Sequence, residues 1–79
     1  MYYVYRLQSV KFPEQNYTGI TTDISSRLQS HNNGQVAHTS QYKPWKIMNY
    51  FAFTDERKAK DFEVYLKPGS GRAFANKHF

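Results

Sequence analysis

The residues best suited to chemistry in this sequence begin with a guanidinium and an imidazole one helical turn apart. Arg27 and His31 are four positions apart in a segment with helical patterning, so they share one face, and Asp23 lies one turn earlier on the same stripe. A guanidinium binds anions, and an imidazole exchanges a proton near neutral pH. A solvated helix face has the same spacing, and there an Asp23–Arg27 pair adds about 0.2–0.5 kcal/mol. The spacing alone does not distinguish a reactive pair from a solvated helix face.

For a carboxylate and two tyrosines elsewhere in the chain, a chemical role also has to be weighed against an ordinary structural one. In a second helical segment, Glu63 lies about 80° from the centre of the apolar face, which places its carboxylate at the rim of that face. A simple surface pair with Lys67, one turn later in the favoured Glu-to-Lys order, also fits this position. Tyr5 and Tyr17 fall on two predicted strands, where a tyrosine ordinarily packs in the core and satisfies one hydrogen bond.

Two strands and a helix are predicted to position the first of these groups. Residues 2–7 alternate between two faces, and residues 16–21 form a second strand, so we expect an antiparallel hairpin with a longer loop. Gly19 inside the second strand indicates a close backbone approach or a bend. Thr22 and Asp23 supply an N-cap and a first-turn carboxylate for a helix that Asn33 and Gly34 close.

The second half of the chain is predicted to add a strand and a helix. After a polar loop, residues 45–53 form the third strand, and Thr54 caps a helix whose first turn carries Asp55 and Glu56. This helix ends by Lys67, because the residue before a proline is disfavoured in helical geometry. Residues 69–71 form a turn, and residues 72–79 form a short terminal helix. The fold class is therefore α/β (α+β), with a three-stranded antiparallel sheet flanked by helices in the order β-β-α-β-α, and residues 1–79 are expected to be one domain.

Composition narrows the classes of function. The 79 residues carry a net charge of +5 and a sequence pI of about 9.6, which makes nucleic acid a candidate partner. Positive charge without acidic neighbours falls on two segments, which contain Lys43 and Lys46 in one and Lys67 and Arg72 in the other. The absence of cysteine excludes disulfides and thiolate-bound metals. With no apolar leader or membrane-length apolar run, we expect a soluble, cytoplasmic protein.

The order and spacing of these motifs resemble one family, the GIY-YIG nuclease superfamily, in particular its small standalone members and the N-terminal catalytic domain of the excision-repair nuclease. The matching strings are Tyr3-Val4-Tyr5, Tyr17-Thr18-Gly19, the Arg27 and His31 helix with its closing Gly34, Lys43-Pro44-Trp45-Lys46, and the helix around Glu63. They span almost the whole chain in the family's order. Two positions depart from the family pattern, because Tyr3 replaces a glycine and Thr18 replaces an isoleucine. Neither change removes a reactive group, although a bulky Tyr3 narrows the site.

The resemblance implies a metal-dependent endonuclease that hydrolyses phosphodiester bonds, with DNA favoured over RNA as substrate and a role in DNA repair or recombination. In this scheme Glu63 holds Mg²⁺ or Mn²⁺, and Arg27 stabilises the charge of the transition state. Tyr5 orients and deprotonates the attacking water, because a nearby guanidinium and metal ion favour the phenolate. Tyr17 and His31 support it by hydrogen bonding or proton relay, and Lys43, Lys46, Lys67 and Arg72 contact the nucleic acid.

Two interpretations from other classes stay open. Basic charge combined with aromatic residues on strands also suits a non-catalytic nucleic-acid-binding module with a degenerate nuclease fold. Binding alone gives no reason for Glu63 among phosphates, which argues against such a module. A purely protein-binding domain would have no affinity for phosphate. A zinc site is excluded by spacing, since His31 and His38 are seven positions apart with no cysteine to complete a ligand set.

Overall fold

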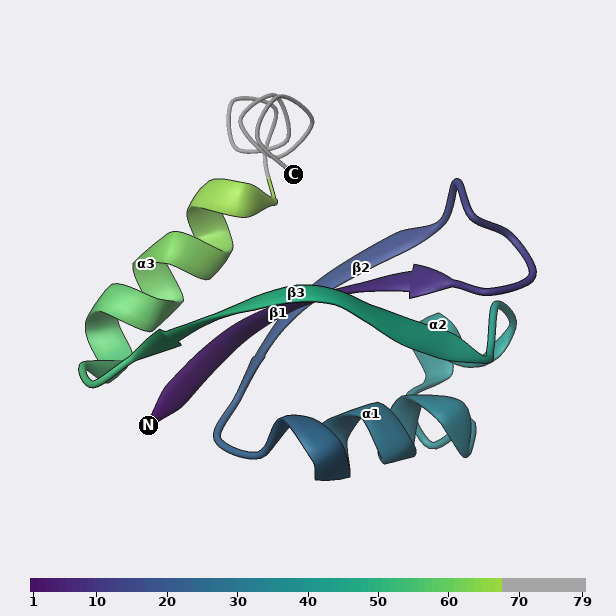
Figure 1. Ribbon diagram of the computed structural model, residues 1–79, viewed down its shortest axis with the longest axis horizontal. Coiled ribbons are helices and arrows are strands. Elements are labelled where there is room, and N and C mark those ends of the chain that lie inside the picture. Colours follow the sequence, from purple (N-terminus) through teal and green to yellow (C-terminus); the bar gives the residue numbers. More distant parts are fainter. Residues whose placement is uncertain (68–79) are drawn as a thin grey trace.

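The computed structural model describes residues 1–67, which form a three-stranded sheet. Helices lie on the two faces of this sheet (Figure 1). The elements follow in the order β1 (Tyr2–Ser9), β2 (Asn16–Thr21), α1 (Ile24–Asn32), α2 (Ala37–Ser40), β3 (Trp45–Phe53) and α3 (Glu56–Leu66). This confirms the predicted fold class and the order of the five predicted elements, to which the structure adds α2. The predicted turn at 69–71 and the terminal helix at 72–79 lie outside the described residues.

The central strand of the sheet is β1, with β2 and β3 paired antiparallel on either side of it. Along β1 the side chains alternate, so Val4 faces α3 and Tyr5 faces α1. In Figure 1 the two helices lie on opposite sides of the sheet, with α2 beside α1. The candidate site is built on the α1 side.

An irregularity in the β1–β3 pairing divides the apolar residues of β3 between the two faces. Arg6 pairs with Asn49 but Leu7 pairs with Ile47, so Met48 is an extra residue between them. Simple alternation would place all four apolar odd-numbered residues of β3 on one face. The bulge instead sends Trp45 and Ile47 to the α1 side, while the remaining two, Phe51 and Phe53, pack with α3.

Both long helices begin at an aspartate. The Asp23 carboxylate accepts a hydrogen bond from the Ser26 backbone N–H (3.1 Å), and the Asp55 carboxylate accepts one from the Arg57 N–H (2.8 Å). The N-caps expected at Thr22 and Thr54 therefore lie one residue later, at Asp23 and Asp55, whose carboxylates accept the hydrogen bonds from the first helical turn. The predicted end of α1 is confirmed, since Gly34 follows Asn33 with a φ of 76°, a conformation that favours glycine.

The short helix α2 lies within the stretch that the sequence predicts as a polar loop. Its four residues are too few to produce a helical pattern of apolar residues. Trp45 anchors the segment that follows it: its backbone N–H donates to the side chain of Asn32 (2.6 Å), and its indole N–H donates to the Thr39 carbonyl (3.0 Å). These bonds fix α2 against the end of α1. None of the helices within residues 1–67 has the length and apolar character needed to cross a membrane.

Candidate active site

Tyr5 is the centre of the candidate site. It lies in the middle of β1 and is 1% exposed, with its ring on the α1 side of the sheet. Opposite it on β2 stands Gly19, where an added Cβ would lie 2.5 Å from the Tyr5 hydroxyl oxygen and 2.9 Å from the Tyr17 ring. The close approach that the sequence predicts at Gly19 is therefore confirmed, and its reason is the passage of the Tyr5 side chain across the strand.

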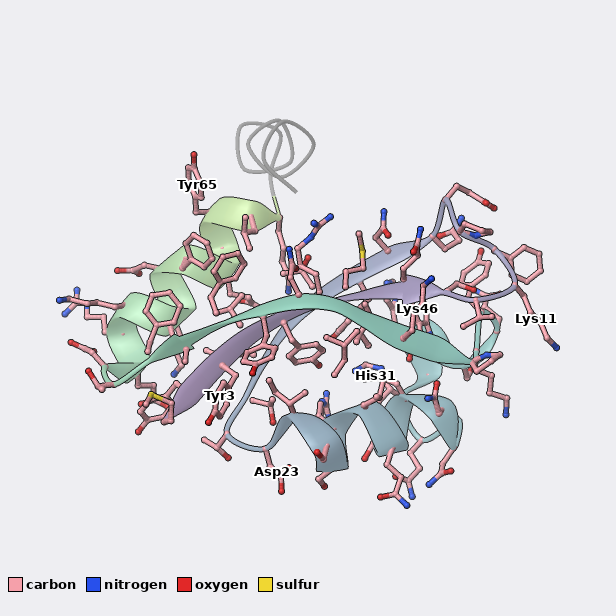
Figure 2. The ribbon with its side chains drawn as sticks, in the orientation of Figure 1. Tyr3, Lys11, Asp23, His31, Lys46 and Tyr65 are labelled. Carbon is pink, nitrogen blue, oxygen red and sulfur yellow. The ribbon has the colours of Figure 1, made fainter. Side chains whose placement is uncertain are left out.

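The shared face of α1 brings two further predicted residues to Tyr5. His31 is fully buried, and its Nε2 lies 3.0 Å from the Tyr5 hydroxyl oxygen; Figure 2 shows this side chain between α1 and the sheet. The Arg27 Nε donates to the same oxygen at 3.4 Å. The ring of Tyr17 lies 4.8 Å from the His31 ring and 6.2 Å from the Tyr5 ring, measured between centroids. Four of the five predicted catalytic residues thus form one cluster.

Sequence reasoning missed Thr39 as a member of this cluster. Its hydroxyl oxygen lies 2.7 Å from His31 Nδ1, and the residue is 1% exposed. The only sequence signal that pointed toward it was the polar character of the segment before β3. Because α2 and the Trp45 indole hold Thr39 in place, both ring nitrogens of His31 have a partner inside the protein.

Burial controls the protonation state of Tyr5. Withdrawal from water raises the pKa of the Tyr5 hydroxyl above its ordinary value, and the negative charges that Tyr17 and Glu63 can carry act in the same direction. The hydrogen bond from Arg27 lowers this pKa, as expected from the sequence, but burial outweighs it. The same hydrogen bond raises the pKa of Arg27. In the protein alone, Tyr5 therefore keeps its proton and Arg27 keeps its charge at neutral pH.

Burial has the opposite consequence for His31, whose charged form carries the proton. Loss of solvation lowers the pKa of His31, and the adjacent charge of Arg27 lowers it further. His31 is therefore neutral at pH 7, with one ring nitrogen free to accept a proton.

We expect the free energy of unfolding to fall as the pH decreases from 7 to about 5.5, because unfolded histidine has a pKa of about 6.5 and binds a proton before folded His31 does. The stabilisation that neutral His31 provides is complete when the pH is above the pKa of histidine in the unfolded state. It is lost as the pH falls toward the lower pKa of His31 in the folded state. Urea denaturation across this range measures the effect. The His31→Gln variant should lose the pH dependence, whereas His38→Gln, which changes an exposed residue of α2, should retain it. Equal slopes in the two variants would contradict the assignment.

Glu63 stands apart from the other four predicted residues. It lies on α3, on the opposite face of the sheet from α1, and α3 also packs against the edge strand β2. Its side chain is 15% exposed, and its carboxylate lies 2.8 Å from the Lys67 ammonium, which is the pair that the spacing also allowed. Its charge nonetheless reaches Tyr5, since it contributes to the raised pKa of that hydroxyl.

The acidic and imidazole side chains of residues 1–67 limit the kinds of metal ion that Glu63 could hold. Within residues 1–67, no group of three or more His, Cys, Asp or Glu side chains could hold a metal. A zinc or calcium cage is therefore not formed by this part of the chain. A single carboxylate suits a hydrated ion such as Mg²⁺, which takes its remaining ligands from water and phosphate. The Lys67 ammonium shows that the carboxylate already accommodates a cation.

The predicted nucleic-acid contacts are dispersed over the molecule. Lys43 is exposed near the end of α1, with its ammonium 3.1 Å from the position that a Cβ on Gly34 would take. Lys46 is exposed on β3, and because it pairs with Gln8 it projects from the face opposite α1 (Figure 2). Lys67 pairs with Glu63, and Arg72 lies outside the described residues. A nucleic-acid contact at these four residues stays a prediction.

Tyr3, the main departure from the family pattern, packs beside Tyr50 of β3. Its ring meets that of Tyr50 edge to face at 5.8 Å, and both rings line a groove of about 470 Å³ at the start of α1. Figure 2 shows Tyr3 pointing toward this end of α1, next to Asp23. The bulk of Tyr3 thus lines this groove together with Tyr50.

Comparison with known proteins identifies the class to which this fold and cluster belong. The GIY-YIG catalytic domain model matches residues 1–77, and the chain therefore belongs to the GIY-YIG family, a nuclease superfamily that acts on nucleic acids. Among its relatives, UPF0213 protein CPE1444 of Clostridium perfringens is 37% identical over 68 residues, covering 85% of this chain and 71% of the relative. UPF0213 protein SpyM3_1077 of Streptococcus pyogenes is 33% identical over 72 residues, covering 90% and 76%. The resemblance seen in the sequence is confirmed.

Proposed function

We propose that this protein is a divalent-metal-dependent endonuclease that hydrolyses phosphodiester bonds in DNA. The observation that carries the proposal is the convergence of Tyr5, Tyr17, Arg27 and His31 from β1, β2 and α1 into one hydrogen-bonded cluster. Core packing alone does not explain why a buried phenol should contact both a guanidinium and an imidazole. Family membership supports nuclease activity in general.

Arg27 is the residue that meets the scissile phosphate. It is only partly buried, whereas Tyr5 and His31 are enclosed, so an incoming phosphate reaches the guanidinium first. The Nε of Arg27 donates to Tyr5, and the planar guanidinium binds phosphate oxygens through its terminal nitrogens and stabilises their growing negative charge. The same contact holds Tyr5 next to the bound phosphate.

Tyr5 and His31 handle the proton of the attacking water. The Tyr5 oxygen takes a proton from water while the hydroxyl proton of Tyr5 passes to His31 Nε2, 3.0 Å away. The hydroxide so formed attacks phosphorus, and the bond to the leaving oxygen breaks. The leaving oxygen departs with the bonding electron pair and takes a proton from solvent to become a hydroxyl group. Both groups begin this relay neutral, because burial raises the pKa of Tyr5 and lowers the pKa of His31. A divalent ion held by Glu63 would neutralise charge on the phosphate.

The test is cleavage by the purified protein of duplex, nicked, flap and single-stranded DNA and of RNA, with Mg²⁺ or Mn²⁺ and with a chelator. We expect DNA cutting that requires the metal. Arg27→Gln should abolish it, whereas Arg57→Gln removes the same charge from an exposed position on α3 and should not. Salt-dependent binding without cutting under any condition would instead favour a non-catalytic nucleic-acid-binding module.

Gly19→Ala is expected to impair the site through geometry alone. The new Cβ would overlap the Tyr5 hydroxyl, whose partners Arg27 and His31 oppose a shift of the ring. We expect a loss of about 1–3 kcal/mol in stability from overpacking. Cleavage should fall on the order of 100-fold, the scale of a displacement of about 1 Å at a reacting group.

The control for Gly19→Ala is Thr18→Ala, which changes the neighbouring residue of β2. Thr18 pairs with Arg6 and faces away from Tyr5. Urea denaturation and cleavage rates, measured where each variant is fully folded, separate the two effects. Gly19→Ala with parental activity would contradict the proposed placement of Tyr5 in the reaction.

A further inference from the structure

We infer that Thr39 is a positioning residue, which holds His31 in the tautomer with its proton on Nδ1 so that Nε2 accepts the proton of Tyr5. The inference deepens the proposed function and rests on it for its catalytic meaning. Thr39 lies on α2, outside the predicted catalytic set. Its hydroxyl is 2.7 Å from His31 Nδ1, and both residues are almost completely buried.

The direction of the hydrogen bonds follows from the chemistry of the two end groups. The Val36 carbonyl can only accept, so Thr39, whose hydroxyl oxygen lies 3.3 Å from it, donates its single proton there. The Thr39 oxygen is then the acceptor for His31, which places the imidazole proton on Nδ1. A neutral imidazole carries one proton, so Nε2 is left as the acceptor that faces Tyr5.

The hydrogen bonds at the other end of the series, between Arg27, Tyr5 and His31, run in the same direction. Arg27 Nε can only donate, so the Tyr5 oxygen accepts from it, and the Tyr5 proton is directed to His31 Nε2. Every group in the series therefore donates to the next, from Arg27 through Tyr5, His31 and Thr39 to the Val36 carbonyl. The reverse tautomer would point a His31 proton at Tyr5 and block the transfer.

Thr39 is itself held in position from two sides. Its backbone N–H donates to the Val36 carbonyl at 3.1 Å, and its carbonyl accepts the Trp45 indole N–H at 3.0 Å. When His31 gains a proton at Nε2, the Nδ1 proton keeps its bond to Thr39, so no rearrangement is needed. The ionisable groups that face His31 are Tyr5 from β1, Tyr17 from β2 and Arg27 from α1, and none of them offers Nδ1 an alternative hydrogen-bond partner.

The test reads the tautomer directly and does not require activity. Long-range ¹H–¹⁵N correlation spectra of the ¹⁵N-histidine-labelled full chain at neutral pH report which ring nitrogen carries the proton, and the loss of one signal set in His31→Gln assigns His31. We expect Nδ1–H in the parent and in Thr39→Ser, and a shift toward Nε2–H in Thr39→Val, which keeps the shape but lacks the hydroxyl. Nε2–H in the parent would overturn the inference, even if Thr39→Val did not fold.

Cleavage kinetics supply the second measurement. Thr39→Val should lower kcat about 10- to 100-fold, the scale that follows removal of a histidine's orienting partner, with KM unchanged. Thr39→Ser should restore the parental kcat. A purely structural role would leave the tautomer of the folded variant unchanged, and that result would overturn the inference. If the parent cuts no substrate, the proposed nuclease function fails, whereas the spectra still decide whether Thr39 sets the tautomer.

Discussion

Replacing Tyr5 with phenylalanine is expected to lower the rate of phosphodiester cleavage about 10²- to 10⁴-fold, the range that positioned acid–base groups contribute. The substitution removes one hydroxyl oxygen, the atom that both Arg27 and His31 contact, and keeps the buried ring. The folded state should survive, because a lost hydrogen bond costs about 0.5–1.5 kcal/mol. Single-turnover cleavage with saturating protein measures the chemical step separately from substrate binding.

Tyr17→Phe is the matched control for this prediction. It removes the hydroxyl of the adjacent tyrosine of β2, whose ring packs on His31 and whose hydroxyl interacts with Arg27, but it leaves the Tyr5 hydroxyl in place. Its rate should fall much less than that of Tyr5→Phe. If Tyr5→Phe cleaves as fast as the parent, Tyr5 is not the group that accepts the proton of water. A large loss in Tyr17→Phe would then transfer the role to Tyr17.

Glu63→Gln is expected to reduce metal-dependent cleavage by about 10²- to 10³-fold, as when one group that stabilises transition-state charge is removed. The amide keeps the size of the side chain but loses the negative charge that would hold the ion. Stability should change little, because an i,i+4 pair of this kind contributes about 0.3–0.5 kcal/mol. Cleavage titrated with Mg²⁺, together with urea denaturation, measures both quantities.

Two other variants of α3 control for the effect of charge. Glu56→Gln breaks the second i,i+4 pair of this helix, an exposed pair with Lys60 at 3.7 Å, and should leave cleavage unchanged. Lys67→Met removes the cation that now lies against Glu63, so half-maximal cleavage should require less Mg²⁺. Equal rates in Glu63→Gln and Glu56→Gln would show that Glu63 does not bind the metal.

Residue types and their spacing predict the order of the strands and of the two long helices, and they predict the chemical identity of the cluster. Alternation along residues 2–7 and the four-residue spacing of Arg27 and His31 are local properties, so they predict which faces are shared before any packing is known. Gly19 likewise indicated a close approach from its residue type alone. Motif order then identified the family, which the comparison confirmed.

The division of the apolar residues of β3 between the two faces of the sheet depends on how this strand pairs with β1. The odd-numbered positions of this strand follow one alternating pattern, and the pattern contains nothing that marks Met48 as the extra residue. Pairing with β1 introduces the bulge, because Leu7 and Val4 require apolar partners on opposite faces of the sheet. The α1-side core that holds Tyr5 depends on this split.

The protonation states and the partner of His31 also came from tertiary structure alone. A residue type fixes an ordinary pKa, but the shifts at Tyr5 and His31 arise from burial, which depends on elements distant in the sequence. Thr39 could not be found from the sequence, because α2 is too short for a periodic signal and its position depends on the Trp45 indole. Local spacing supplies reactive groups, whereas long-range packing sets their solvation and the direction in which a proton can move.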